Sequence, residues 1–382
     1  MRKICVVTGS RAEFGLMSGI MQAIHNDPEL ELQVIATNMH LSPEFGLTYK
    51  EIENVGFTIN KKVYMLLSSD TPNATAKSVG LGFVSFADAY EDLKPDLIVV
   101  LGDRFEIIAA VSTALFFKIP VAHLHGGEIT EGAYDDCIRH SITKMSHLHF
   151  TSTEVYRQRV IQLGEDPKRV FNVGAPGIEN IKKVPLMNKE ELEATMDGFT
   201  FSDKTLLITY HPVTLENSTA EEQIKNLLAA LDEYPEYKII FTLPNSDTDG
   251  RVIIKLINEY VAKHPGRAVA YPSLGLRRYL SALQFVKAAV GNSSSGIIEV
   301  PSFGIPTLNI GDRQRGRLAA ESVVNCGTSK DDILAGLEQV FKAEHKEIYN
   351  PYEGKNTTAE ILLVLKTFPL EGLIQKTFYN IK

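Results

Sequence analysis

The stretch Leu-Ile-Val-Val-Leu-Gly-Asp-Arg, residues 97–104, begins with five consecutive apolar residues. This apolar run stops abruptly at a glycine, which two charged residues follow. Apolar side chains at every position predict a strand that is buried on both faces of a parallel sheet. A second run, Val121 to Leu124, ends in the same way at His-Gly-Gly-Glu, residues 125–128. Because the carboxyl ends of neighbouring parallel strands meet at one edge of their sheet, these polar endings predict a site at that edge.

The same alternation of apolar runs and helix-periodic segments extends outward from this stretch in both directions. We predict N-terminal strands at Ile4 to Thr8, Leu32 to Thr37, Leu97 to Leu101, Val121 to Leu124, Leu148 to Thr151 and Val170 to Val173. We predict helices at Phe14 to Ile24, Asn73 to Leu93, Phe105 to Phe117, Asp135 to Met145 and Glu154 to Leu163. Strands and helices that alternate at this pace are typical of a doubly wound parallel sheet.

A polar, charged stretch at 185–203 separates this alternation from a second one. Its strands are predicted at Leu206 to Thr209, Lys238 to Thr242, Ala268 to Ala270, Ala288 to Val290 and Thr307 to Ile310. Its helices are predicted at Ala220 to Leu231, Arg251 to Lys263, Leu276 to Phe285 and Ser294 to Pro301. With 382 residues, more than one core usually supports, we expect an α/β protein of two doubly wound Rossmann-like domains with a central cleft. The expected domains are 1–185 and 186–356, and a helix within 357–382 is expected to cross back to the first domain.

Composition excludes several classes of function. The net charge of -8 disfavours nucleic acid and membrane surfaces as partners. The three cysteines are too scattered for a disulfide framework or a thiolate metal site. The N-terminus lacks a signal-peptide pattern and no stretch is long enough to span a bilayer, so a cytoplasmic location is expected.

Six acid/base side chains are expected to converge at the first sheet's edge: Asp103, His125, Glu128, Asp135, Arg139 and His140. A metal site is an unfavoured interpretation, because residues i and i+2 of a strand, such as His123 and His125, point to opposite faces. General acid/base chemistry is favoured instead. Asp135 and Asp136 would also stabilise the N-terminus of a helix through its dipole. That structural role explains one of the two aspartates, but it does not explain the whole cluster of six acid/base side chains.

Polar strand endings in the second half predict an anion site. Gly-Asn-Ser-Ser-Ser-Gly, residues 291–296, stands where a strand meets a helix, and Ser293 and Ser294 leave backbone N–H groups open there. Glu299 lies about one turn further on, where a carboxylate can accept from a ribose. Arg313 opens a loop with three arginines in five positions, and His211 directly follows another strand. Arg11 stands after the first strand. A helix-capping role would explain the serines by themselves, and a solvated basic loop would explain the arginines by themselves. Taken together, however, these strand endings favour a diphosphate ligand.

Six motifs are similar to those of the hydrolysing UDP-N-acetylglucosamine 2-epimerases of sialic acid synthesis, especially the bacterial capsular enzymes. They are Gly102-Asp103-Arg104, His125 to Glu128, Asp135 to His140, His211 to Thr214, Gly291 to Ser294 and Arg313-Gln314. The resemblance implies a two-domain fold like that of the GT-B glycosyltransferases, with a UDP-sugar in the cleft and the second domain binding its UDP. It also implies elimination of UDP to a 2-acetamidoglucal, then hydration to N-acetylmannosamine, without a cofactor or metal.

The resemblance further implies roles for single residues. Asp103 and Asp135 match catalytic carboxylates, and Arg139 matches a nearby functional arginine. His211, Ser293 and Arg313 match diphosphate contacts, and Glu299 matches a ribose contact. Many members of the family have glutamate where His125 stands, so either His125 or Glu128 is expected to carry the proton-transfer role.

Alternative functions remain open from the sequence. The same chemistry could act on UDP-N,N'-diacetylbacillosamine for legionaminic acid synthesis. A GT-B glycosyltransferase would need an acceptor groove and fewer carboxylates, and a UDP-sugar sensor would tolerate changes at Asp103 and Asp135. A homo-oligomer, dimer or tetramer, is expected.

Overall fold

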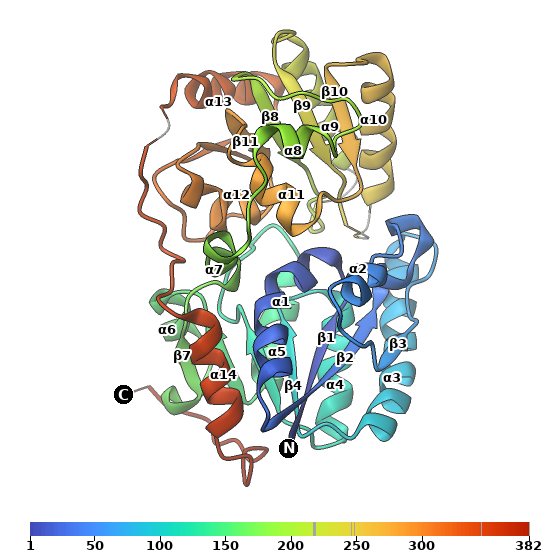
Figure 1. Cartoon of the computed structure of the whole chain (residues 1–382), viewed down its shortest axis with the longest axis vertical. Helices are drawn as coiled ribbons and strands as arrows, with labels where there is room; N and C mark the ends of the chain where they lie inside the picture. Colours follow the sequence, from blue (N-terminus) through green and yellow to red (C-terminus); the bar gives the residue numbers. More distant parts are fainter. Residues whose placement is uncertain (217–218, 246, 248, 345, 382) are drawn as a thin grey trace. The chain divides into compact units, whose positions relative to one another are not determined.

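The computed structural model of the chain describes residues 1–216, 219–245, 247, 249–344 and 346–381. It contains two compact α/β units (Figure 1). The first unit consists of Met1–Glu128, Asp135–Asn180 and Tyr352–Lys382. The second unit consists of Ile129–Tyr134 and Ile181–Pro351.

The first unit contains a parallel sheet of seven strands in the order β3-β2-β1-β4-β5-β6-β7. The strands are β1 Arg2–Thr8, β2 Leu30–Thr37, β3 Lys61–Val63, β4 Leu97–Leu101, β5 Val121–Leu124, β6 Leu148–Thr151 and β7 Val170–Asn172. The helices are α1 Arg11–Asn26, α2 Tyr49–Asn54, α3 Pro72–Leu93, α4 Phe105–Phe116, α5 Asp135–Met145, α6 Glu154–Gln162, α7 Pro176–Lys183 (whose last residues belong to the second unit) and α14 Thr357–Thr367. Short 3₁₀ turns occur at η1 Asn38–Leu41, η2 Pro43–Phe45 and η3 Pro167–Arg169.

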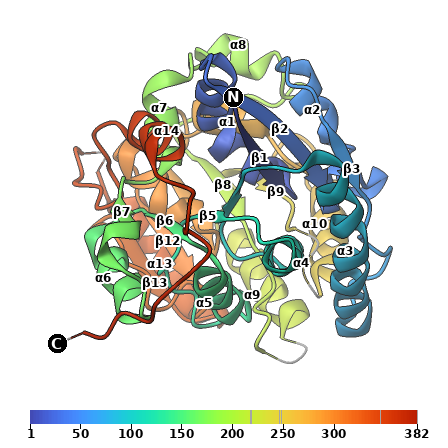
Figure 2. The same ribbon diagram turned by 90° about the horizontal axis from the view of Figure 1, so that it is seen from below.

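Helices cover both faces of this sheet, which explains the continuous apolar strands. Ile4 and Val6 of β1 pack with α1 and α14, whereas Cys5 and Val7 of the same strand pack with α3 and α4. Successive strand residues point to opposite faces, so a strand covered on both sides needs apolar residues at every position. Helices α3 and α4 lie side by side on one face (Figure 2).

The second unit repeats this plan with six parallel strands in the order β10-β9-β8-β11-β12-β13. The strands are β8 Thr205–Thr209, β9 Lys238–Thr242, β10 Ala268–Tyr271, β11 Ala288–Gly291, β12 Thr307–Ile310 and β13 Val323–Cys326. The helical elements are α8 Lys189–Glu193, α9 Ala220–Asp232, α10 Gly250–Lys263, α11 Gly275–Ala282, α12 Ser295–Ile298, η4 Val300–Phe303 and α13 Lys330–Lys342.

The expected fold class of two doubly wound parallel sheets is confirmed. The edge strands β3 and β13 were not predicted, and neither were helices α2, α7, α8 and α13. The helix predicted from Ser294 to Pro301 is shorter: α12 ends at Ile298 and a 3₁₀ turn follows. Pro301 has no N–H to continue the α-helical hydrogen bonds, which accounts for the break.

The division into units follows contacts in space rather than chain order. The segment Ile129–Tyr134 belongs to the second unit, although residues on both sides of it belong to the first. The C-terminal helix α14 belongs to the first unit, where it packs on α1. In the described part of the chain, no helix has the length and apolar character needed to cross a membrane.

Candidate active site

Each sheet has one point where the strand order reverses, and polar residues follow the strands there. In the first sheet β1 lies between β2 and β4, so the reversal falls between β1 and β4. In the second sheet it falls between β8 and β11. Ligands of open α/β sheets bind outside the carboxyl ends of the strands at such points.

His125 begins a tight turn directly after β5. Its φ of 64° lies in the left-handed region, which is uncommon for a residue with a side chain. The turn continues through Gly127, where an added Cβ would lie 2.5 Å from the carbonyl oxygen of Tyr156. A side chain at Gly127 is therefore excluded, and the turn packs tightly against α6.

The turn brings His125 and Glu128 into a buried pair. Nδ1 of His125 lies 2.6 Å from Oε1 of Glu128, and the Ser152 hydroxyl donates to the same oxygen at 2.7 Å. His125 is 6% exposed and Glu128 is 2% exposed. Nε2 of His125 is buried without a hydrogen-bond partner among the described residues. One ring nitrogen is thus held by a carboxylate, while the other has no hydrogen-bond partner among the described residues.

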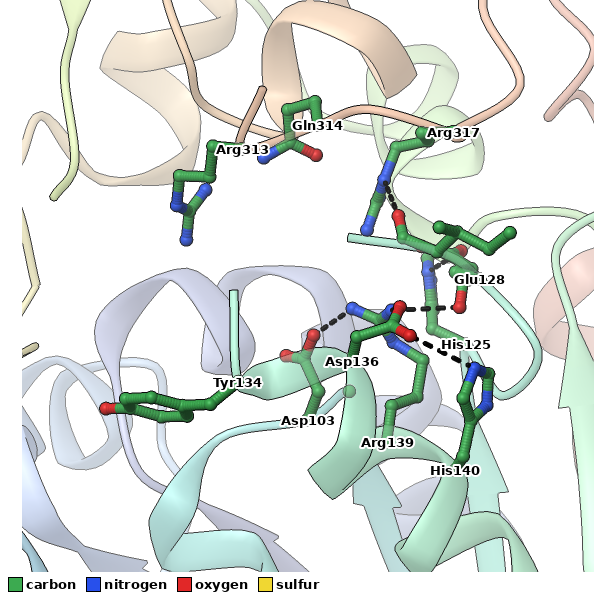
Figure 3. A network of polar contacts seen from close by, with 12 residues as sticks. Asp103, His125, Glu128, Tyr134, Asp136, Arg139, His140, Arg313, Gln314 and Arg317 are labelled. Atoms are coloured by element: carbon green, nitrogen blue, oxygen red, sulfur yellow. Dashed lines mark hydrogen bonds and ion pairs between the residues drawn. The ribbon is translucent and has the colours of Figure 1, made fainter. Parts of the chain in front are cut away.

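Arg139 of α5 connects the polar endings of the first sheet (Figure 3). Its guanidinium forms an ion pair with Asp103 and donates to the carbonyl oxygen of Glu128 at 2.9 Å. It also lies 3.5 Å from Asp136, whose other oxygen lies 3.4 Å from His140. Arg139 is 2% exposed, so it fixes Asp103 and the backbone of the turn in a single arrangement.

Asp135, which belongs to the expected cluster, and the neighbouring His123 are both buried but have different roles. Asp135 is the first residue of α5 and is buried. His123 is a structural residue: burial lowers its pKa to about 3, and the neutral ring donates from Nε2 to the Gly102 carbonyl at 2.7 Å. His123 thereby supports the turn that carries Asp103. The described residues include no group of three or more His, Cys, Asp or Glu side chains arranged to hold a metal ion.

Asn292 organises the polar endings of the second sheet. Its side chain accepts from the backbone N–H of His211 at 2.7 Å and donates to the carbonyl of His211 at 2.8 Å. It thereby joins the segments that follow β8 and β11. Gly291 has to be glycine, because its φ is 130° and an added Cβ would lie 2.0 Å from the Thr209 carbonyl oxygen.

The three arginines of the 312–317 loop have separate partners. Arg313 and Gln314 both donate to the carbonyl of Asn292, at 3.1 and 2.9 Å. Arg315 is exposed and pairs with Glu131 at 2.8 Å, and Arg317 donates to the Ile129 carbonyl at 3.3 Å (Figure 3). Arg313 therefore contacts Asn292, whereas Arg315 and Arg317 hold the segment 129–134.

The other expected ligand residues lie in the places that their strands predict. Ser293 and Ser294 are half-buried between β11 and α12, and the Ser293 hydroxyl accepts from the N–H of Ser295 at 3.4 Å. Glu299 is buried between α12 and η4. Arg11 opens α1 and pairs with Glu51 at 2.5 Å.

The sequence-based candidates omitted three residues that organise these sites: Ser152, Asn292 and Gln314. Ser152 directly follows the last residue of β6, so the rule that favoured the other candidates could also have selected it. Asn292 and Gln314 stand inside motifs that we singled out, and their burial shows why they matter. A buried amide needs partners: the Asn292 side chain finds them on the His211 backbone, and Nε2 of Gln314 donates to the Asn292 carbonyl.

Comparisons with known proteins agree with this fold. The family model described as UDP-N-acetylglucosamine 2-epimerase matches residues 22–366. The GDP/UDP-N,N'-diacetylbacillosamine 2-epimerase (hydrolyzing) of Campylobacter jejuni is 47% identical, over 91% of this chain and 88% of that protein. The polysialic acid biosynthesis protein P7 of Escherichia coli is 36% identical, over 100% of this chain and 98% of that protein.

Solved structures show the same fold. The UDP-GlcNAc 2-epimerase of Neisseria meningitidis, crystallised with UDP-GlcNAc, superposes with a TM-score of 0.78 at 20% identity. The match covers 95% of this chain and 99% of that chain. The fold is thus that of the two-sheet, GT-B-like enzymes that act on sugar nucleotides. Within this class, the chain belongs to the UDP-N-acetylglucosamine 2-epimerase family.

Proposed function

We propose that the protein is a hydrolysing sugar-nucleotide 2-epimerase in which His125 transfers the proton at C2 of the sugar. The observation that supports this role is the buried His125–Glu128 pair. A carboxylate can only accept a hydrogen bond, so Nδ1 of the neutral ring carries the hydrogen and Nε2 holds a lone pair. An imidazole oriented in this way by a carboxylate is arranged as a general base.

The reaction proceeds in two steps. His125 takes the C2 proton while the bond between C1 and the diphosphate oxygen breaks, and the nucleoside diphosphate leaves with the electron pair. The resulting 2-acetamidoglycal then adds water: the oxygen binds C1, and a proton reaches C2 from the opposite face. The products are a free sugar of inverted configuration at C2 and the nucleoside diphosphate, so the glycosidic C–O bond is hydrolysed.

The other polar residues receive supporting roles in this proposal. Asp103 and Asp135 are the carboxylates that exchange the remaining protons, and Arg139 holds Asp103 in place. His211, Ser293, Ser294 and Arg313 bind the diphosphate, Glu299 binds the ribose, and Arg11 supplies a further positive charge. The buried Oε1 of Gln314, which has no partner among the described residues, supports a ligand beside Asn292.

For the sugar, we propose UDP-N,N'-diacetylbacillosamine as the first candidate and UDP-N-acetylglucosamine as the second. The first is supported by the 47% identity to a Campylobacter jejuni enzyme named for that sugar. The second is supported by the match to the polysialic acid protein over the full chain, since sialic acid synthesis requires N-acetylmannosamine. The two sugars differ at C4 and C6, away from the atoms that react.

Proton NMR in D₂O tests the reaction and the sugar together. The purified protein is incubated, without added cofactor, with UDP-N,N'-diacetylbacillosamine, its GDP analogue or UDP-N-acetylglucosamine. We expect a free sugar with inverted C2 that carries deuterium there, together with the nucleoside diphosphate. Release of the nucleotide without deuterium at C2 would indicate plain hydrolysis or transfer, and binding without turnover of any of the three would indicate a sensor.

We also propose that the protein forms a homo-oligomer, a dimer or a tetramer. Helices α3 and α4 lie side by side and expose large apolar side chains, among them Val84 (66% exposed) and Phe116 (79% exposed). Exposed apolar side chains gathered on one face often mark an interface with another protein. Light scattering should give a multiple of the 42.3 kDa chain mass, and Phe116→Lys should shift the distribution towards monomer.

A further inference from the structure

Two glutamates that have no part in the proposed reaction lie buried at the strand-order reversal of the first sheet. Glu13 is in the first turn of α1, next to the turn that follows β1, and Glu106 is the second residue of α4, next to the turn that follows β4. Glu13 is 5% exposed and Glu106 is fully buried. A Cβ added at Gly9 would lie 2.2 Å from Oε1 of Glu106, so the carboxyl group fills the space beside the first turn.

Each glutamate uses one oxygen to hold its own turn. Oε2 of Glu13 accepts from the backbone N–H groups of Gly9 and Ser10, at 2.7 and 3.2 Å. Oε1 of Glu106 accepts from Nε of Arg104 at 2.8 Å, and Arg104 is the residue that directly follows Asp103. These bonds account for one oxygen of each carboxyl group.

The other two oxygens, Oε1 of Glu13 and Oε2 of Glu106, are buried and have no hydrogen-bond partner among the described residues. Two carboxylates can only accept, so both oxygens would stay unsatisfied if both groups were ionised. A single proton would satisfy both oxygens if Oε1 of a protonated Glu13 donated its O–H to Oε2 of Glu106. Such an O–H···O⁻ bond is among the stronger hydrogen bonds in proteins.

We propose that Glu13 and Glu106 share one proton, and that this proton joins the turns after β1 and β4 and so positions Asp103. The proton resides on Glu13, whose Oε1 donates to Oε2 of Glu106, while Glu106 keeps its ion pair with Arg104. This inference rests on the proposed function only where it concerns Asp103. The shared proton itself is a property of the folded chain.

The charges around the pair support this assignment. Burial, followed by repulsion from Glu106, raises the pKa of Glu13 to about 8, although Arg104 and the N–H groups of Gly9 and Ser10 lower it. Among the described residues, the titratable side chains of His40 and Arg11 also adjoin the Gly9–Ser10 turn. His40 contacts Thr8 and is neutral, since burial lowers its pKa to about 4, and Arg11 is engaged by Glu51.

Glu13→Gln provides a test that is independent of activity. The amide keeps an acceptor for Gly9 and Ser10 and a donor for Glu106, but it cannot titrate. In the native protein Glu13 holds a proton that the unfolded chain has lost above its ordinary pKa of 4.5. Stability from this group therefore falls as pH rises towards about 8, and the variant lacks this fall.

We expect the urea midpoint of the wild type to decline relative to that of Glu13→Gln between about pH 5 and about pH 8. Glu91→Gln, which removes an exposed carboxyl group of α3, is the matched control and should run parallel to the wild type. Infrared spectra at neutral pH should show a protonated-carboxyl band in the wild type that Glu13→Gln abolishes. Parallel pH profiles for all three proteins, or no such band in the wild type, would overturn the shared proton.

The positioning role is tested by the contrast between two variants. Glu13→Leu removes both the acceptor and the donor, so the turns lose their link and kcat should fall on the order of 10²-fold, with UDP affinity unchanged. Glu13→Gln should restore most of kcat and should lack any activity loss that accompanies deprotonation near pH 8. If Glu13→Leu does not fold, an unchanged alkaline limb in Glu13→Gln would by itself contradict the positioning role.

Discussion

At the scale of single residues, His125 has a left-handed backbone conformation and a ring Nε2 without a hydrogen-bond partner among the described residues. Its left-handed φ is a conformation that asparagine also adopts with little strain. His125→Asn should therefore preserve the turn, and its amide can still donate to Glu128, but it cannot transfer protons. We expect turnover to fall roughly 10²–10⁴-fold, with unchanged thermal unfolding. The exposed His25→Asn serves as control, and near-full turnover of a folded His125→Asn would rule out the proton-transfer role.

Asp103 offers a second test at the same scale, because it separates chemistry from binding. Asp103→Asn keeps the shape of the side chain and removes the negative charge that pairs with Arg139. We expect a loss of roughly 10²–10⁴-fold in kcat, with the dissociation constant of UDP nearly unchanged in calorimetry. Equal losses in binding and in rate would instead support a binding role for Asp103.

At the scale of elements, the segment Ile129–Tyr134 supports the loop that carries Arg313. An added Cβ at Gly132 would lie 2.7 Å from the carbonyl oxygen of Asp312 and 2.9 Å from Cα of Arg313. These are backbone atoms, so Gly132→Ala must displace the loop. We expect unfolding free energy to drop by about 1–3 kcal/mol and UDP to bind more weakly.

Gly80→Ala is the matched control for this prediction. Gly80 lies in α3, and an added Cβ there meets nothing within 4 Å. Alanine is favoured over glycine in a helix, so this variant should be neutral or slightly stabilising. If Gly132→Ala matches Gly80→Ala in stability and in UDP affinity, the segment does not support the loop.

At the scale of the whole molecule, buried charges set the response to acid. Burial by itself would raise the pKa of Glu165, but contacts with His149, Lys144 and the C-terminal Lys376 lower it to about 2. A carboxyl group whose pKa falls on folding stabilises the protein above its ordinary pKa of 4.5 and loses that contribution as pH falls towards 2. Lys376→Met removes one of the cations, so we expect its acid unfolding midpoint to move to higher pH than that of the wild type.

Circular dichroism during acid titration measures this shift. Lys355→Met, at an exposed position of the same unit, is the control and should unfold at the same pH as the wild type. Lys376 also donates to the carbonyls of Lys144 and Ser146, so its loss should loosen the C-terminal tail as well. A Lys376→Met midpoint equal to that of Lys355→Met would show that the tail does not protect Glu165 from acid.

The sequence by itself determined the class of the fold and the edge of each sheet at which the polar side chains gather. Strands β4, β5, β6, β9 and β12 lie at their predicted residues. Of these, β4 is apolar at every position, as expected of a strand covered on both faces. Strands β3 and β13 escaped prediction because they are short and only partly buried. Their short segments carry too little apolar signal.

Only the tertiary structure decided how the polar side chains pair. The spacing of His125 and Glu128 leaves their roles open, whereas the left-handed turn makes one the partner of the other. The arginines of the 312–317 loop look equivalent in sequence, yet Arg313 contacts Asn292 while Arg315 and Arg317 hold the segment 129–134. Glu13 and Glu106 both lie beside Gly9, although more than ninety residues of chain separate them. Hydrogen bonds between distant segments depend on backbone geometry that local periodicity does not encode, so they appear only once the chain is folded.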